Sequence, residues 1–285
     1  MSGATRAAER AEPVFDRLAV VGLGLLGGSV ALAARARRLA REIRVVDPAA
    51  GDAVPFPVTS LEEAASWATE IVLAVPVDQI ETVVEGMAPH VGPDTLVTDT
   101  ASVKVPMAEA AHRFLPVPEN CVGAHPMAGG DVSGFAHASA DLFEGAACIL
   151  ALAGREPPAV VDRVEQFWQG LGTFTDRRTP AEHDAITAQL SHAPHLIAYA
   201  FAMGLAESDA LGLAGPGLRD FVRIARANPA LWCEILLRNR ERVAEEGARF
   251  RAHLEQLLAA LERGDGAALE EALRSGQRAI EKLDR

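Results

Sequence analysis

A glycine-rich turn directly follows a short apolar run near the N-terminus and sets narrow limits on the fold. Residues 18–21 are Leu-Ala-Val-Val, and glycines stand at positions 22, 24 and 27. Residues 30–40 have helical composition, and a second apolar run at 43–47 ends on an acid. Strand, glycine turn, helix and strand in this order predict a βαβ unit with a dinucleotide-binding turn.

Each glycine of this turn has its own expected role. Gly22 permits the tight turn, Gly24 lets the backbone approach a pyrophosphate, and Gly27 allows the helix to pack closely on the strand. The next amides, at Leu25 and Leu26, open a helix whose N-terminus favours an anion. The alternative interpretation is a packing turn in a flavodoxin-like domain that binds nothing.

An acid at the end of the second predicted strand indicates which nucleotide is bound. Asp47 stands 20 residues after Gly27, the spacing at which a carboxylate accepts hydrogen bonds from the adenosine ribose hydroxyls. Since a carboxylate there would repel a 2′-phosphate, the sequence favours NAD over NADP as cofactor. Val75, at the end of another predicted strand, is expected to line the same cofactor site.

Short apolar strands recur through the first part of the chain, separated by segments of helical composition. The predicted strands are 71–75, 95–98, 121–124 and 146–152, and the predicted helices are 61–68, 77–87, 103–114 and 157–170. This alternation predicts a parallel sheet covered by helices on both faces.

Beyond about Thr179 the strand-like runs vanish and helix formers dominate. The predicted fold is therefore an α/β Rossmann-type dinucleotide-binding domain followed by an all-α dimerisation domain. We expect a disordered tail at 1–16, the NAD-binding domain at 17–176 and the helical domain at 177–285.

Two helix starts are expected in the second domain. Pro180 follows a threonine cap and opens a helix that runs to about Gly204, and Pro229 opens a long helix that Gly264 closes. The second helix is long for a globular protein, so we expect it to lie in the subunit interface of a homodimer. The alternative is a break near Gly247.

Composition excludes several classes of protein. With 27 Lys and Arg against 39 Asp and Glu, the formal charge of −12 argues against a general nucleic-acid binder. Cys121, Cys148 and Cys233 match no disulfide or zinc spacing, so they are interpreted as buried, reduced thiols of a cytoplasmic protein. The uncharged run at 18–34 contains four glycines, so no membrane association is predicted.

A histidine after a predicted strand is the first candidate for chemistry. His125 is placed at the carboxyl edge of the sheet, where open α/β folds bind ligands. A neutral imidazole there can accept a hydroxyl proton while hydride leaves the same carbon. Ser102 follows the strand ending at Asp99 and could orient the imidazole. The alternative is a hydrogen-bonded structural histidine.

Two further segments carry candidate polar groups. His192 and His195 are three residues apart around Pro194, but no nearby segment supplies a third ligand, so no metal is predicted. A glycine-rich loop then opens a predicted helix that carries Arg219 and Arg223 on one face. Either guanidinium could bind a carboxylate through two hydrogen bonds, and the alternative is a surface salt bridge.

Together these motifs resemble the prephenate/arogenate dehydrogenase family of tyrosine biosynthesis. The resemblance covers about residues 17–240, in family order, and is carried by residues 22–29, 99–104, 123–129, 141–145, 183–184, 191–195 and 218–225. It implies an NAD-dependent oxidation of the ring carbinol of prephenate, with loss of the ring carboxylate as carbon dioxide and formation of 4-hydroxyphenylpyruvate.

The resemblance also implies roles for individual residues. His125 is similar to the residue that hydrogen-bonds the ring hydroxyl, Ser102 to the residue that supports it, and Arg223 to a ligand of a substrate carboxylate. His195 corresponds to a second polar group on the substrate side and is counted with the catalytic residues. Ser191 corresponds to a residue near the nicotinamide.

Substrate preference remains open at this point. Gly217, Arg219 and Asp131 are further expected substrate-binding residues, but Gly130 and Asp131 stand where many members carry a larger polar residue and then Glu. Prephenate, arogenate and 4-amino-4-deoxyprephenate are therefore all candidates. Lys282 is the only lysine after residue 104, which argues against reductases with a catalytic lysine. A non-catalytic NAD-binding regulatory protein is the alternative from another class.

Overall fold

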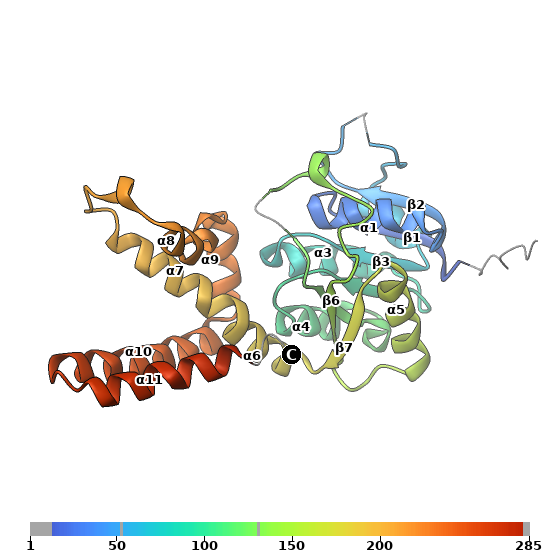
Figure 1. Ribbon diagram of the computed structural model, residues 1–285. Helices are drawn as coiled ribbons and strands as arrows, with labels where there is room; N and C mark the ends of the chain where they lie inside the picture. The colour runs from blue at the N-terminus through green and yellow to red at the C-terminus, as the bar shows by residue number, and fades with distance from the viewer. Residues whose placement is uncertain (1–12, 52–53, 130–131, 282–285) are drawn as a thin grey trace, which may run out of the picture. The chain divides into compact units, whose positions relative to one another are not determined.

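The computed structural model describes residues 13–51, 54–129 and 132–281. Figure 1 labels its helices and strands. Contacts divide the chain into two units that interleave along the sequence. The first runs to Thr187 and includes Arg226–Arg238, and the second comprises Ala188–Ala225 and the chain from Asn239 onward. The sequence predicts one boundary after residue 176. The two observed units do not follow this single boundary, because the segment with Ile235, far along the chain, returns to the first unit and Ile235 is buried in its core.

A parallel sheet forms the centre of the first unit. Its strands are β1 (Phe15–Val21), β2 (Ala40–Val46), β3 (Glu70–Leu73) and β4 (Leu96–Asp99), in the order β2-β1-β3-β4. The last residues of these strands pair with their neighbours in one row. The segments that follow the strands therefore all emerge at the same edge of the sheet.

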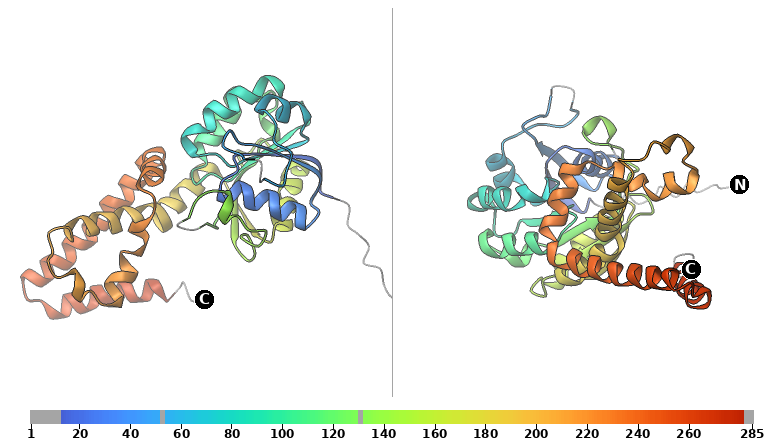
Figure 2. Two further views of the ribbon diagram at one scale, coloured as in Figure 1. Left: turned by 90° about the horizontal axis from the view of Figure 1, so that it is seen from above. Right: turned by 90° about the vertical axis from the view of Figure 1, so that its left-hand side faces the viewer.

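Alternation along β1 assigns one set of helices to each face. Leu18 and Val20 pack with helices α1 (Leu25–Ala36) and α5 (Pro158–Gly170). Ala19 and Val21 pack with the opposite layer. That layer contains α2 (Leu61–Trp67), α3 (Ile80–Met87) and α4 (Val105–Phe114). The predicted cover on both faces is confirmed, and the left view of Figure 2 shows the two layers.

A second sheet of three strands extends this unit. It consists of β5 (Gly123–Pro126), β6 (Ala147–Ala151) and β7 (Phe174–Arg178), with β5 and β6 antiparallel and β6 and β7 parallel. The expectation of a wholly parallel sheet is therefore wrong. β7 was not predicted, because its sequence Phe-Thr-Asp-Arg-Arg is exposed and charged. A single parallel bridge from Val97 to Cys121 brings β5 beside β4.

Helix α6 (Pro180–Thr187) begins as the sequence predicts. The Thr179 hydroxyl accepts a hydrogen bond from Glu182 N, and the Glu182 carboxylate accepts one from Thr179 N. A π-helical segment (Ala188–His192) and helix α7 (Ala193–Gly204) follow. The predicted helix to Gly204 thus contains a π-helical stretch directly before α7, whose second residue is Pro194.

The second unit is helical in the residues described. Besides the π segment and α7 it contains α8 (Pro216–Phe221), α10 (Arg240–Glu262) and α11 (Gly266–Ile280). Helix α9 (Pro229–Arg238) belongs to the first unit.

Short 3-10 turns occur in both units. They lie at Val77–Gln79, Ala88–His90, Pro118–Asn120, Phe135–His137, Leu211–Leu213 and Arg223–Arg226.

The predicted single helix from Pro229 to Gly264 is interrupted. The break lies at Asn239, the N-cap of α10, whose φ of −111° and ψ of 26° are not helical. Gly247, the predicted alternative break point, lies inside α10. Asn239 is 5% exposed and its side-chain amide is 3.1 Å from Nδ1 of His192, so a buried polar contact fixes the break.

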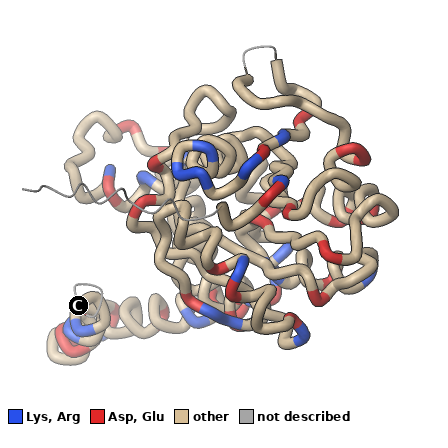
Figure 3. Tube along the Cα trace, turned by 90° about the vertical axis from the view of Figure 1, so that its right-hand side faces the viewer, with Lys and Arg blue, Asp and Glu red and all other residues tan. Residues whose placement is uncertain are grey.

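The cysteines and the charged groups complete this description. Cys121 and Cys148 are buried free thiols, and burial raises the pKa of both. Cys233 is exposed, so its predicted burial is wrong. None of the helices in the described part of the chain is both long and apolar enough to cross a membrane. Figure 3 shows acidic and basic residues interspersed along the trace.

Candidate active site

The glycine turn has the geometry that a nucleotide phosphate needs. Gly22 has a φ of +91°, and a Cβ there would lie 2.4 Å from the carbonyl oxygen of Ala74. A Cβ on Gly27 would lie 1.9 Å from the carbonyl oxygen of Gly22, so α1 could not approach the turn with any other residue. A Cβ on Gly24 would meet nothing within 4 Å, so the backbone is open at the helix N-terminus.

The first residues of α1 supply the amides for an anion. Helix α1 starts at Leu25, with Gly24 as its N-cap. The amides of Leu25, Leu26 and Gly27 fall in the first turn, where an α-helix offers no carbonyl partner to its N–H groups. These donors and the helix dipole fit the pyrophosphate of a dinucleotide.

Asp47 lies beside this turn, directly after β2. Its Oδ2 accepts a hydrogen bond of 2.7 Å from Leu23 N, and its Oδ1 accepts one of 2.8 Å from Ala49 N. These two bonds hold the carboxylate next to the turn and leave further lone pairs for ribose hydroxyls.

Val75 and Ser102 follow neighbouring strands at the same edge. Leu73, the last residue of β3, pairs with Val21 on one side and with Asp99 on the other. Because the sheet order reverses at β1, the crevice beyond β1 and β3 is where such folds bind their ligands. The structure thus brings the predicted cofactor residues of the first unit together.

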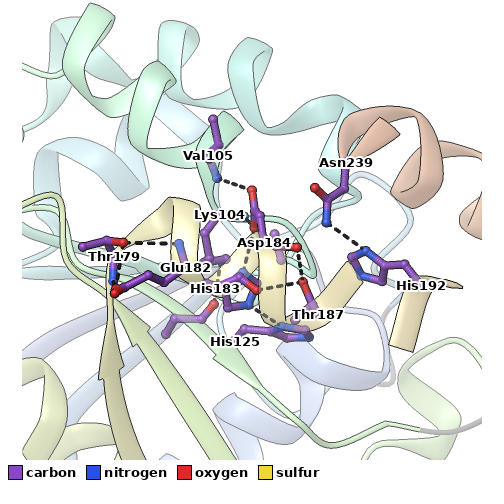
Figure 4. Close-up of polar contacts among 12 residues, drawn as sticks. Lys104, Val105, His125, Thr179, Glu182, His183, Asp184, Thr187, His192 and Asn239 are labelled. Atoms are coloured by element: carbon purple, nitrogen blue, oxygen red, sulfur yellow. Dashed lines mark hydrogen bonds and ion pairs between the residues drawn. The ribbon is translucent and has the colours of Figure 1, made fainter. Parts of the chain in front are cut away.

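His125 lies one step beyond this edge. Cys121 pairs with Val97 in parallel, which places Gly123 level with the end of β4 and His125 past it. The His125 side chain is half-buried, and its Nδ1 is 2.8 Å from Nε2 of His183 (Figure 4).

His183 and Asp184 form a buried pair on α6. His183 is fully buried, and its Nδ1 is 2.7 Å from Oδ1 of Asp184. The Asp184 carboxylate also accepts hydrogen bonds from the backbone amides of Lys104, at 2.7 Å, and Val105, at 3.0 Å. The N-terminal turn of α4 therefore holds the carboxylate in place.

A buried ion pair fixes the backbone that carries His125. Lys104 Nζ contacts Oδ2 of Asp99 and donates a 2.6 Å hydrogen bond to the carbonyl oxygen of Ala124. Asp99 Oδ1 accepts a 3.0 Å hydrogen bond from Ala124 N. Since both side chains of the ion pair are fully buried, their mutual contact and these hydrogen bonds offset the cost of burying charge.

The environment of His183 favours its neutral form. Burial lowers the pKa of His183 and is the largest effect, while its hydrogen bond to Asp184 acts in the opposite direction. The positive charge of Lys104 lowers this pKa further. The neutral imidazole is therefore the favoured form of His183, with one nitrogen that donates a hydrogen bond and one that accepts.

The second unit contains the other candidates. Ser191 lies in the π segment, and its carbonyl oxygen is 2.9 Å from Nδ1 of His195. Arg219 lies in α8 and donates from Nε to the carbonyl oxygen of Ala214 at 3.3 Å. Gly217 is the second residue of the same helix.

Arg223 does not continue the helix of Arg219. The single helix expected to carry both residues on one face ends at Phe221, and Arg223 opens a 3-10 turn instead. Both arginine residues are exposed. Asp131, a predicted substrate-binding residue, lies outside the described residues.

Comparison with known families supplies the identification. Residues 36–175 match the nucleotide-binding domain of prephenate dehydrogenase, and residues 179–275 match its dimerization domain. The chain belongs to the prephenate dehydrogenase family. The predicted family, fold class and assignment as a dehydrogenase are confirmed.

Curated relatives and solved structures of this family span most of the chain. The prephenate dehydrogenase of Bacillus subtilis (strain 168) is 30% identical over 273 residues, which cover 89% of this chain and 72% of that protein. The cyclohexadienyl dehydrogenase of Zymomonas mobilis is 28% identical over 289 residues, which cover 93% of this chain and 95% of the relative.

Two solved structures are also similar. One is the prephenate dehydrogenase of A. aeolicus in complex with hydroxyphenyl propionate and NAD+, with a TM-score of 0.85, 26% identity, and coverage of 94% of this chain and 98% of that one. The other is Synechocystis arogenate dehydrogenase, with a TM-score of 0.82, 27% identity, and coverage of 94% and 99%.

Sequence reasoning gave no role to the polar pair behind His125 in this prephenate dehydrogenase homologue. His183 and Asp184 contributed to the family resemblance, but nothing in the local pattern indicates that their side chains meet His125, 58 residues earlier. The one sequence feature that could have pointed to this pair is the His-Asp dipeptide in the first turns of a capped helix.

No group of three or more His, Cys, Asp and Glu side chains within residues 13–51, 54–129 and 132–281 could hold a metal ion.

Proposed function

We propose that this protein catalyses the NAD-dependent oxidative decarboxylation of prephenate to 4-hydroxyphenylpyruvate. The observation that carries the proposal is the position of His125 just beyond the edge where the glycine turn and Asp47 stand. The B. subtilis relative is a prephenate dehydrogenase, and the A. aeolicus homologue was solved with NAD+ and hydroxyphenyl propionate. That ligand combines a phenol ring with a carboxylate, as the proposed product does.

The residues of the first unit fit the cofactor. The amides at the start of α1 would hold the pyrophosphate, and Gly24 offers the open backbone that close approach requires. Asp47 would accept hydrogen bonds from the ribose hydroxyls and would repel a 2′-phosphate, so NAD is the proposed cofactor rather than NADP. The nicotinamide, when bound, accepts the hydride of the reaction.

The chemistry then needs one base and one cation. His125 takes the proton of the ring hydroxyl as hydride leaves the same carbon, and the ring becomes electron-poor. The bond to the ring carboxylate supplies the missing electron pair, carbon dioxide leaves, and the ring becomes aromatic. The phenolate oxygen formed in this step takes the proton back from His125, which gives the phenol and restores the neutral imidazole. Ser102 supports His125 in this assignment.

The remaining groups of this proposal are residues of the second unit, together with Asp131. Arg223 binds a substrate carboxylate, because a permanently charged guanidinium suits a dianion in an otherwise acidic protein. Arg219, Gly217 and Asp131 complete the substrate site, and His195 and Ser191 act beside the substrate and the nicotinamide.

Arogenate is the second candidate substrate, because the Synechocystis homologue is an arogenate dehydrogenase. 4-Amino-4-deoxyprephenate is the third, since Gly130 and Asp131 depart from the common family pattern. We further propose a cytoplasmic homodimer that associates through the helical domain, whose family model is a dimerization domain.

Parallel assays of the three substrates with NAD and with NADP test the proposal. Prephenate with NAD should give the highest kcat/KM, with one carbon dioxide released for each NADH formed. A higher kcat/KM with arogenate or the amino analogue would replace the substrate but keep the reaction. Absence of turnover with all three, in protein that binds NAD, would leave an NAD-binding regulatory protein instead.

A further inference from the structure

We propose that His183, held by Asp184, fixes the tautomer of His125, so that Nδ1 of His125 carries the hydrogen and Nε2 carries the proton-accepting lone pair. His183 is then a positioning residue that acts through His125. The catalytic part of this inference rests on the proposed function, whereas the tautomer itself is a property of the protein without substrate.

The argument begins at Asp184, whose contacts define it as an acceptor. Its two carboxylate oxygens accept hydrogen bonds from the backbone amides of Lys104 and Val105, and Oδ1 also faces His183 Nδ1 at 2.7 Å. A carboxylate in this position can only accept. The hydrogen in the third contact must therefore belong to Nδ1 of His183.

The second step concerns the other nitrogen of His183. Its charged and titratable neighbours are Asp184, Lys104, Asp99 and His125. Burial is the largest influence and lowers the pKa of His183, so the ring carries one hydrogen, already placed on Nδ1. Nε2 therefore offers a lone pair, and the 2.8 Å contact to His125 is a hydrogen bond donated by Nδ1 of His125.

The third step follows for His125. A neutral imidazole has one N–H, so a hydrogen on Nδ1 leaves the lone pair on Nε2. In water the opposite tautomer of histidine predominates, and it could not accept a proton at Nε2. When Nε2 takes the proton of the substrate hydroxyl, the Nδ1 hydrogen bond to His183 remains and supports the cation formed.

The surroundings hold both rings in this arrangement. The Thr187 hydroxyl donates to the carbonyl oxygen of His183 at 3.0 Å, one turn along α6. The two ring centroids are 5.0 Å apart with planes tilted by 59°. Lys104 and Asp99 fix the peptide of Ala124, immediately before His125. Figure 4 shows His183 between His125, Asp184 and Thr187.

Nitrogen-15 NMR of the full chain, labelled at histidine and free of substrate, tests the tautomer directly. The His125 signals are assigned by their loss in His125→Asn, with His112→Gln as a control for an exposed histidine. The expected result is a protonated Nδ1 and an unprotonated Nε2 in the neutral state. An Nε2-protonated His125 in the folded protein would overturn the proposal, whatever the enzyme turns over.

Two replacements of His183 separate positioning from packing. Gln places an amide oxygen near the position of Nε2 and can still accept from His125, whereas Met fills similar space without an acceptor. His183→Met should shift His125 toward the Nε2-protonated tautomer and lower kcat on the order of 10²-fold or more with little change in the Kd for NAD. His183→Gln should retain the wild-type tautomer and keep kcat within about tenfold of the wild type.

An equal loss of kcat in the folded Met and Gln variants, with the tautomer of His125 unchanged in both, would reduce His183 to a packing role and overturn the proposal. If the Met variant does not fold, the tautomer of the wild type and the kcat of the Gln variant still decide. If the wild type turns over none of the three substrates, the proposed function fails, while the NMR result still tests the tautomer.

Discussion

Two buried carboxylates on the four-stranded sheet have opposite surroundings. Asp99, at the end of β4, contacts Lys104 and accepts hydrogen bonds from the amides of Ala101 and Ala124. Glu70, at the start of β3, is 2% exposed. Arg163 lies 2.8 Å from its Oε1, but no donor within the described residues makes a hydrogen bond to that oxygen. The Thr69 hydroxyl donates a 2.5 Å hydrogen bond to the other carboxylate oxygen, Oε2, but this bond and Arg163 offset only part of the effect of burial on Glu70.

The charge of Glu70 is expected to cost stability at neutral and alkaline pH. Burial raises the pKa of Glu70 from 4.5 to about 7. The folded state holds the proton of Glu70 more tightly than the unfolded chain does, so protonation of Glu70 stabilises the fold. This stabilisation is fully present below pH 4.5, the pKa of the unfolded chain, and is lost as the pH rises through about 7, the pKa in the folded state. Glu70→Gln does not titrate, so the free energy of unfolding of the variant minus that of the wild type should rise on the order of 2 kcal/mol between about pH 5 and about pH 8.

Urea unfolding at both pH values measures this difference. Glu42→Gln, which removes an exposed acid from the same sheet, is the matched control and should show no such change. A difference for Glu70→Gln that is the same at both pH values would contradict the expected titration.

His125→Asn tests the base at the same scale. Asn retains a polar side chain but accepts no proton, so kcat should fall on the order of 10²-fold or more. The Kd for NAD should remain near that of the wild type, because the proposed cofactor contacts of the glycine turn and Asp47 do not involve His125. Steady-state kinetics and a calorimetric NAD titration measure both quantities, and an unchanged kcat would remove His125 from the chemistry.

Elements were predictable from the sequence where local residues determine them. The turn between β1 and α1 follows a backbone path that has room only for glycine at positions 22 and 27. The start of α6 depends on a threonine and a glutamate three residues apart. Strand β7 is stabilised by pairing with β6. The exposed, charged sequence of β7 gives no sign of this pairing. The break at Asn239 depends on a contact with His192, 47 residues earlier.

In the candidate site, too, contacts between residues far apart in the sequence could not be predicted. Asp47, Val75 and Ser102 could be placed together because parallel strands end at one edge. The contact between His125 and His183 joins β5 to α6 and depends on how the second sheet packs. No periodicity along the chain encodes such a contact.

Two glycines of the β1–α1 turn form a matched pair for experiment. Gly22→Ala places a Cβ 2.4 Å from the carbonyl oxygen of Ala74 at a φ of +91°, so it should destabilise the fold by more than about 1 kcal/mol. Gly24→Ala meets nothing within 4 Å and should change stability by less than about 1 kcal/mol. It should nevertheless raise the Kd for NAD at least about tenfold, equal to about 1.4 kcal/mol, because the added Cβ would occupy the space proposed for the pyrophosphate.

Thermal unfolding and NAD titration of both variants measure these effects. Gly24→Ala separates binding from folding, since its expected defect is confined to the cofactor. Wild-type affinity for NAD in a folded Gly24→Ala protein would show that the cofactor does not approach this turn.

At the scale of the whole molecule, the chain passes repeatedly between its two units. Helix α9 returns to the first unit, where Ile235 is 4% exposed in the core and Trp232 packs beside it. The second unit leaves a row of large apolar side chains exposed on α10. Phe250, Leu254 and Leu258 are 41%, 41% and 47% exposed, and their spacing of four residues places them on one helix face.

Such a row is typical of a surface that another chain covers, and the family model for this region is a dimerization domain. Leu254→Glu should therefore raise the dimer Kd at least about 30-fold, equal to about 2 kcal/mol, because it places a charge in an apolar contact. Gln256→Glu adds the same charge on the opposite face of α10 and should leave the Kd unchanged. Light scattering over a dilution series measures the mass of both variants, and a Leu254→Glu protein that dissociates no more readily than Gln256→Glu would place the interface elsewhere.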